Sequence, residues 1–257
     1  MSAKALFPKR HRIPELGELS PGLIIFDKGG TLIDFRGLWS AWIRELVRRL
    51  ESITGLPMAG RLFRAMGFDP NSGRIDPTGR LATGTMADLR ALTFDLLCQA
   101  GLSRRASDAA VETAWFAPDP VEQVRPLADL SELFTDLRAR GIKIAVATMD
   151  DRAPTEATFA ALGVESFVDA LVCGDDGLPP KPAPDMVWAV CQATGVAPAQ
   201  AAVVGDSVTD LEMGRAAGAG LIVGVLSGVT PEDVLAPHAD VLLESVAELL
   251  TSTPGIR

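Results

Sequence analysis

The chain has 257 residues, of which 47% are hydrophobic and 22% are charged, and these proportions are typical of a globular protein rather than a disordered one. Its net charge of −9 argues against a nucleic-acid partner, because nucleic-acid binders usually carry a basic face. No apolar run approaches the ~20 residues that span a membrane, and residues 1–22 lack the apolar segment of a secretory signal. We therefore expect a cytoplasmic protein with no membrane partner, in which residues 1–22 form an N-terminal arm.

The scarcity of some residue types excludes several kinds of site. The only histidines are His11 and His238, so neither a His-based catalytic triad nor a His-rich zinc site is expected. The three cysteines are far apart in the sequence and form no Cys-x-x-Cys pair, which is typical of reduced, buried or incidental thiols. They are Cys98, Cys173 and Cys191.

The first informative segment, residues 23–32, reads Leu-Ile-Ile-Phe-Asp-Lys-Gly-Gly-Thr-Leu. It is an apolar run that ends in an aspartate and then turns on two glycines. An uncharged run of this kind predicts a buried strand of a parallel sheet. Asp27 would then lie at the carboxyl end of the strand, where open α/β sheets bind their ligands.

Residues 36–128 are expected to form an all-helical cap, inserted directly after the first strand as a lid over the strand ends. Three helices are predicted, over 38–53, 84–100 and 104–116. The Gly- and Pro-rich stretch 67–83 between the first two predicts a loop. Trp39 and Trp42 share one helix face, and we expect them to pack between cap helices rather than to contact a substrate.

The remainder of the chain alternates short apolar runs with segments of helical periodicity. The predicted strands are 142–148, 168–173, 201–205 and 220–226, and the predicted helices are 131–140, 155–162, 183–195 and 208–217. This alternation predicts an α/β fold with a doubly wound, Rossmann-like, mostly parallel sheet. Residues 23–35 and 129–257 would form this core.

Four segments place reactive side chains in a recognisable order. Asp27 is followed by Thr148 at the end of the second core strand, by Lys181 between prolines, and by Asp206 and Asp210 in Val-Val-Gly-Asp-Ser-Val-Thr-Asp. In type and order these residues resemble the four motifs of the haloacid dehalogenase (HAD) superfamily, and the resemblance covers residues 23–226. The match is specific because four motifs agree in sequence order. The branch that the chain resembles is the phosphoglycolate-phosphatase-like one, whose members carry a helical cap.

Each residue also has a structural interpretation. Asp206 and Ser207 could cap the helix at 208–217, and Asp210 could complement its dipole. Lys181 could be an exposed loop cation, and the Thr148 hydroxyl could bond its own backbone. We favour the functional interpretation because all the positions occur together in the order of the family.

The resemblance implies phosphoryl transfer to Asp27 as a covalent aspartyl phosphate, with Thr148 holding a phosphoryl oxygen and Lys181 shielding the nucleophile. Carboxylate oxygens are the ligands that Mg²⁺ prefers, so Asp27, Asp206 and Asp210 are the expected metal ligands. In the family, the backbone carbonyl at the position of Gly29 is a further ligand. The predicted function is therefore Mg²⁺-dependent hydrolysis of a small phosphate monoester.

Gly29 departs from the family pattern, Asp-x-Asp-Gly-Thr, in which the second aspartate protonates the leaving oxygen and later activates water. Glycine can do neither, and general acid–base catalysis is typically worth about 10²–10⁴-fold in rate. We expect slow turnover with alkyl phosphates. We also expect slow hydrolysis of the aspartyl phosphate for any substrate, even one with a good leaving group.

Three interpretations of Gly29 stay open. The first is a phosphatase that is slowed by Gly29 or uses another acid, for which Asp34, Asp69 and Asp76 are candidates. The second is a weakly active or inactive protein that binds a phosphorylated ligand or partner. The third is a substitution introduced by cloning or design into an active phosphatase. Three other branches of the family also lack this aspartate, but this chain lacks what each of them needs. Ion pumps need membrane helices, and phosphonoacetaldehyde hydrolases need a cap lysine. Haloacid dehalogenases need a bulky aromatic residue at position 29.

The expected partner is a small phosphorylated metabolite, and the chain is expected to be a monomer or a homodimer. Residues proposed to contact the substrate follow the nucleophile, follow Thr148 or lie in the Gly/Pro-rich cap stretch. They are Gly30, Thr31, Met149, Arg74 and Arg80. The arginines are included because a guanidinium is a natural donor to a second anionic group.

Overall fold

A computed structural model describes residues 21–116 and 124–250 of the chain. The predicted N-terminal arm therefore lies almost wholly outside the described residues. Within them, no helix is long and apolar enough to cross a membrane.

Six parallel strands form one sheet in the order β3-β2-β1-β4-β5-β6. The strands are β1 (Leu23–Phe26), β2 (Lys143–Ala147), β3 (Ala170–Val172), β4 (Ala201–Gly205), β5 (Leu221–Val225) and β6 (Val241–Leu243). This topology confirms the predicted α/β fold class. The edge strand β6 was not predicted, because three apolar residues are too few to show a strand period.

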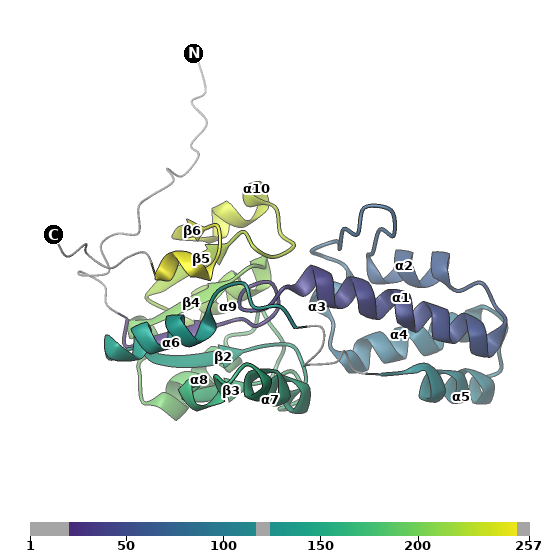
Figure 1. Cartoon of the computed structure of the whole chain (residues 1–257), viewed down its shortest axis with the longest axis horizontal. Helices are drawn as coiled ribbons and strands as arrows, with labels where there is room; N and C mark the ends of the chain where they lie inside the picture. Colours follow the sequence, from purple (N-terminus) through teal and green to yellow (C-terminus); the bar gives the residue numbers. More distant parts are fainter. Residues whose placement is uncertain (1–20, 117–123, 251–257) are drawn as a thin grey trace, which may run out of the picture.

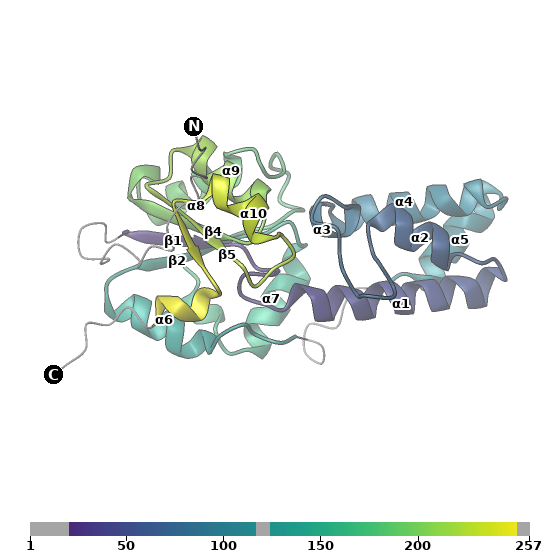
Figure 2. The same ribbon diagram turned by 90° about the horizontal axis from the view of Figure 1, so that it is seen from above.

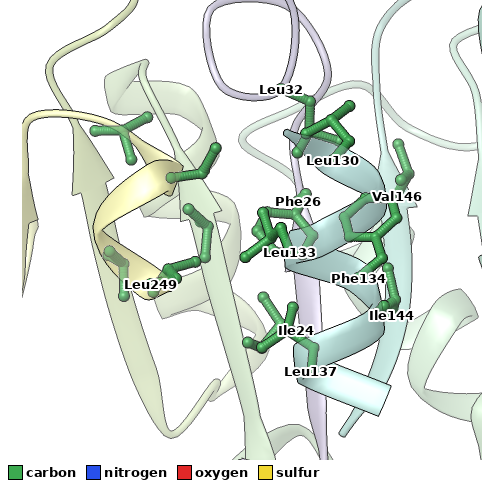
Figure 3. Close-up of a cluster of buried hydrophobic side chains, with 14 of the residues drawn as sticks. Ile24, Phe26, Leu32, Leu130, Leu133, Phe134, Leu137, Ile144, Val146 and Leu249 are labelled. Carbon is green, nitrogen blue, oxygen red and sulfur yellow. The ribbon is translucent and has the colours of Figure 1, made fainter. Parts of the chain in front are cut away.

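Helices cover both faces of the sheet. Successive strand residues point to opposite faces, so each strand packs against helices on both sides. On one face, Ile24 and Phe26 of β1 pack against Leu133 and Leu137 of α6 (Leu130–Ala139), as Figure 3 shows. On the other face, Leu23 and Ile25 pack against α8 (Asp185–Thr194) and α9 (Val208–Ala217). Neither face of β1 is exposed, which explains why its sequence is uniformly apolar.

The remaining described elements complete the core. They are α7 (Arg152–Ala161), α10 (Glu232–Leu235) and four 3₁₀ turns at Glu165–Phe167, Pro198–Gln200, Ala236–His238 and Val246–Leu249. Gly195 and Gly218 end α8 and α9 with positive φ angles of 70° and 78°, so both helices stop where the sequence predicted.

Five helices between β1 and α6 form a separate cluster with its own apolar core, which we call the helical unit (Figures 1 and 2). They are α1 (Phe35–Thr54), α2 (Ala59–Met66), α3 (Arg80–Thr83), α4 (Met86–Gln99) and α5 (Arg104–Ala114). Trp42 is fully buried in this core, against the edge of Trp115 with ring centroids 5.4 Å apart. Its indole nitrogen donates a hydrogen bond to the Phe116 carbonyl oxygen.

The stretch 67–83, predicted to be a loop, contains the one-turn helix α3, so that part of the prediction is wrong. A single turn has no apolar period that a sequence could reveal. Both Figure 1 and Figure 2 place α3 at the end of the helical unit that faces the sheet. This short helix therefore helps to form the wall opposite the strand ends.

Strand order reverses at β1, since β2 lies on one side of it and β4 on the other. In open α/β sheets, ligands bind outside the carboxyl ends of the strands at such a point. Asp27, Thr148 and Asp206 are the residues directly after, respectively, β1, β2 and β4. The fold therefore brings three polar side chains from distant parts of the chain to one edge.

Candidate active site

Asp27, Asp206, Asp210 and Lys181 meet at the carboxyl edge of the sheet. One carboxylate oxygen from each aspartate lies within 4.8 Å of the others. The Lys181 ammonium donates hydrogen bonds to Asp27 Oδ1 at 2.6 Å and to Asp210 Oδ1 at 2.5 Å. The lysine side chain is only 3% exposed, so these are buried ion pairs rather than surface contacts.

The start of α9 explains the orientation of Asp210. Ser207 is the N-cap residue, and its hydroxyl accepts a hydrogen bond from the Asp210 backbone N–H. In return, Asp210 Oδ2 accepts from the Ser207 N–H at 3.1 Å and from its hydroxyl at 2.5 Å. This capping box occupies one oxygen and leaves Oδ1 for Lys181. Asp210 therefore has both the structural and the site role that its sequence position allowed.

Two glycines let the backbone approach the Asp206 carboxylate. A Cβ added to Gly30, whose φ is +84°, would lie 2.5 Å from Asp206 Oδ2, and one added to Gly228 would lie 1.7 Å from it. The Val229 N–H donates to the same oxygen at 3.3 Å. The loop after β5 therefore belongs to the site, although we did not predict it. Its sequence signal is a glycine shortly after a strand, in Ser227-Gly228-Val229.

The site carries an excess of negative charge. Three carboxylates face one ammonium, which leaves a formal charge of −2. Burial, together with the charges of Asp210 and Asp27, raises the pKa of Asp206 well above its ordinary value. Burial also raises the pKa of Asp27 from 3.8 to about 7, although the Lys181 charge opposes this shift. For Lys181, burial acts to lower the pKa, but the charges of Asp210 and Asp27 outweigh it and raise the pKa.

These residues fit a divalent cation. The donors are hard carboxylate oxygens, which suit Mg²⁺, and a charge of +2 would cancel the formal excess. Without a cation, such a cluster of carboxylates is held together against its own repulsion and desolvation. A cation held by Asp27, Asp206 and Asp210 would remove that penalty.

The charge excess leads to a stability prediction for Asp206→Asn. Because the folded-state pKa of both Asp27 and Asp206 is raised, folding binds protons, and the metal-free protein loses stability as the pH rises from about 4 through 7. Removing the Asp206 charge should stabilise the chelator-treated protein by about 1 kcal/mol at pH 8, or ~2–4 °C in Tm. The gain should shrink at pH 5. Thermal unfolding at both pH values checks this, and a lower Tm for the variant at pH 8 would contradict it.

A cavity opens above Asp27 between the sheet edge and the helical unit. Among the residues predicted for the site, it is lined by Asp27, Gly29, Thr148, Met149, Lys181, Asp206 and Asp210. Thr148 is 2% exposed, and its hydroxyl accepts from the Asp150 N–H. Thr31 lies behind the lining, where its hydroxyl donates to Asp206 Oδ1 at 3.4 Å. Gly30 does not line the cavity either, but it packs against Asp206.

The two arginines proposed as substrate contacts lie away from this cavity. Arg74 lines a separate depression with Asp69 and Asp76, and Arg80 is exposed at the start of α3. Neither is among the residues around Asp27. A substrate could therefore reach either arginine only if it extended beyond the cavity.

The three acids considered as replacements for the missing aspartate are engaged elsewhere. Asp34 caps α1 by accepting from the Gly37 N–H, Asp69 accepts from Ser72, and Asp76 accepts from Thr78. None of them lines the cavity. An acid that does line the cavity, and that we did not predict, is Asp150, two positions after Thr148. Its carboxylate pairs with the buried Lys28 ammonium at 2.7 Å.

An aromatic ring occupies the place where a side chain at position 29 would begin. A Cβ added to Gly29 would lie 2.7 Å from Phe35 Cδ2, closer than real Cβ contacts occur. Phe35 opens α1 and packs against Trp39, with ring centroids 5.7 Å apart. A side chain at position 29 would therefore meet the Phe35 ring at its first carbon.

Comparison with known proteins agrees with this geometry. Residues 21–218 match the family model of haloacid dehalogenase-like hydrolases, so the chain belongs to that family. It is 29% identical over 242 residues to a phosphoglycolate phosphatase of Rhodospirillum rubrum, covering 89% of each chain. It is also 31% identical over 232 residues to the human N-acylneuraminate-9-phosphatase, covering 88% of this chain and 91% of the relative.

Solved structures show the same fold. A predicted phosphoglycolate phosphatase from Haemophilus somnus superposes with a TM-score of 0.70 at 20% identity, covering 91% of this chain and 98% of that one. CbbY from Rhodobacter sphaeroides, solved in complex with phosphate, superposes with a TM-score of 0.58 at 20% identity, covering 90% and 98%. The relatives place the chain on the phosphoglycolate-phosphatase-like branch of the family.

Proposed function

We propose that this chain is a Mg²⁺-dependent phosphatase that acts on a small phosphate monoester through an aspartyl phosphate on Asp27. The observation that carries the proposal is the convergence of three carboxylates and one buried ammonium at the strand ends, directly below a cavity. Such a site can accept a phosphate only if cations offset its charge. The named phosphatases among the relatives support the same reaction class.

The roles of the side chains follow from their contacts. Asp27, held at 2.6 Å from Lys181, is the nucleophile, and the lysine charge favours its ionised form and orients it. Thr148, at the end of β2, offers its hydroxyl to a phosphoryl oxygen. Asp27, Asp206 and Asp210, with the Gly29 carbonyl, would hold Mg²⁺. When bound, the ion supplies charge neutralisation and orientation for the transferring phosphoryl group.

Gly29 limits the second half of this reaction. Water must displace phosphate from Asp27, and no side chain at position 29 can take the proton of that water. We infer slow release of phosphate after a faster phosphorylation. A second candidate function, binding of a phosphorylated ligand without turnover, is favoured by one observation: the Phe35 ring lies where the Cβ of an acid at position 29 would begin.

Metal removal tests the proposal. Treatment with a chelator should abolish phosphate release from a panel of small phosphate esters, and added Mg²⁺ should restore it. Saturating Mg²⁺ at about 100 times its Kd should also stabilise the native state by about 2.7 kcal/mol, because only the folded chain presents the site. The variant Asp206→Asn serves as the control and should lose this thermal shift. Phosphate release that is unaffected by chelation, from protein with no Mg²⁺ shift, would contradict the proposal.

A further inference from the structure

The helical unit closes the cavity with uncharged side chains only. The lining that comes from it consists of Phe35, Trp39, Pro77, Leu81, Ala82 and then Thr83 and Gly84. Trp39 and Leu81 are at most 5% exposed, so this part of the wall is packed apolar surface rather than a solvated rim. All the charged groups among the described lining residues come instead from the sheet side.

This division gives the cavity two chemically different halves. The phosphoryl group fits the half that holds Lys181 and the carboxylates. Whatever group the phosphate esterifies must then face the apolar half. No arginine or lysine of the described lining is positioned there to receive a second anion, since Lys181 is committed to Asp27 and Asp210. A carboxylate in that half would be desolvated without a partner, which is costly.

Gly29 and Phe35 also restrict the group that leaves with the phosphate ester oxygen. With no acid at position 29, the leaving oxygen must depart as an anion. A phenolic oxygen, with a pKa of about 10, leaves readily as an anion. An alkoxide leaves poorly, because it is about as basic as hydroxide, whose parent water has a pKa of about 15.7. The aromatic ring of Phe35 lies beside Gly29. Together with Trp39 it offers a surface on which the ring of a substrate could stack.

We propose that the substrates of this site are phosphate monoesters of an apolar, acidic hydroxyl, with aryl phosphates as the type, and that Phe35 and Trp39 form the wall that selects them. This inference rests on the proposed phosphatase function. It replaces the expectation of a second anionic group, for which Arg74 and Arg80 were proposed, and the expectation that Trp39 does not contact a substrate.

The chemical steps balance without an acid at position 29. An Asp27 oxygen attacks phosphorus, the bond from phosphorus to the aryl oxygen breaks, and the electron pair leaves with the aryloxide. Water then attacks the phosphorus of the aspartyl phosphate, the bond to the Asp27 oxygen breaks, and the proton of the water passes to solvent. The first step needs no proton, and the second lacks the base that a side chain at position 29 would supply, so the aryl alcohol should appear in a burst of one equivalent per site.

Three esters separate the two causes of selectivity: phenyl phosphate, benzyl phosphate and phosphoglycolate, each with Mg²⁺. The measurement is the second-order rate constant for phosphorylation of Asp27, taken from rapid quench. Benzyl phosphate should exceed phosphoglycolate by at least about tenfold, because both are alkyl esters and only one is apolar. Phenyl phosphate should exceed benzyl phosphate by at least about 10²-fold, because its oxygen leaves without a proton.

A smaller or reversed ratio in either comparison would overturn the substrate proposal while leaving phosphatase function intact. If no ester phosphorylates Asp27, the proposed function itself fails. The variant Ala82→Arg places a cation on the apolar wall and should lower the preference for benzyl phosphate over phosphoglycolate by at least about tenfold. Ala91→Arg, on the exposed face of α4, is the matched control and should leave the preference unchanged. An unchanged preference in Ala82→Arg would also overturn the proposal.

Discussion

Asp27→Asn is expected to lower both the burst of phosphorylation and steady-state phosphate release by at least about 10⁴-fold, the loss typical of removing a covalent nucleophile. An amide oxygen can still accept the hydrogen bond from Lys181, so the variant keeps the contacts of the site and loses the attacking carboxylate. Quenched-flow measurement with an aryl phosphate gives the burst, and coupled detection of phosphate gives the steady state.

A surface variant controls for general effects of removing an aspartate. Asp136 pairs with Arg140 on α6, outside the residues that line the cavity, and both side chains are about one-third exposed. Asp136→Asn should therefore leave both rates within about twofold of the parent protein. If Asp27→Asn kept more than about a tenth of the parent burst, Asp27 would not be the nucleophile.

Restoring an acid at position 29 is expected to accelerate turnover, but only when Phe35 is reduced in size. The double variant Gly29→Asp with Phe35→Ala should raise steady-state turnover by about 10²–10⁴-fold, because an acid–base group would again assist both half-reactions. In Gly29→Asp alone the new side chain meets the Phe35 ring at its first carbon, so the gain should be smaller. Steady-state kinetics with benzyl phosphate provides the measurement, since an alkyl leaving group depends most on the acid.

Phe35→Ala alone is the control, and it should not accelerate turnover because it supplies no acid. Equal gains in the single and double variants would show that the ring does not obstruct position 29. No gain in the double variant would show that proton transfer does not limit this site. That last result, combined with tight binding of phosphate esters, would favour a binding protein over an enzyme.

Much of the site was predictable because its residues follow apolar runs. Asp27 and Asp206 come directly after strands whose uniform apolarity marks them as buried, and the carboxyl ends of parallel strands meet at one edge. Lys181 was predictable as a site residue only through its family motif, since a lysine between prolines is equally typical of an exposed loop. The double role of Asp210 was also visible, because Ser-x-x-Asp at a helix start is a capping pattern.

The features that were missed depend on packing between distant elements. Phe35 lies beside Gly29 because α1 begins immediately after the turn that follows β1. No local sequence pattern predicts the direction in which its ring points. The loop at Gly228 joins the site through a backbone N–H, which every residue but proline carries. Arg74 and Arg80 are proposed for their chemistry alone, because where they lie depends on the fold of the stretch 67–83, which periodicity does not determine.

Whether the sheet edge performs covalent phosphoryl transfer is tested most directly by mass spectrometry of the peptide that contains Asp27. The protein is mixed with an aryl phosphate and Mg²⁺, quenched in acid and digested. We predict one phosphoryl group on Asp27, present before steady state is reached and absent from chelator-treated protein. An unmodified Asp27 peptide, recovered while phosphate is being released, would show that the reaction does not proceed through this carboxylate.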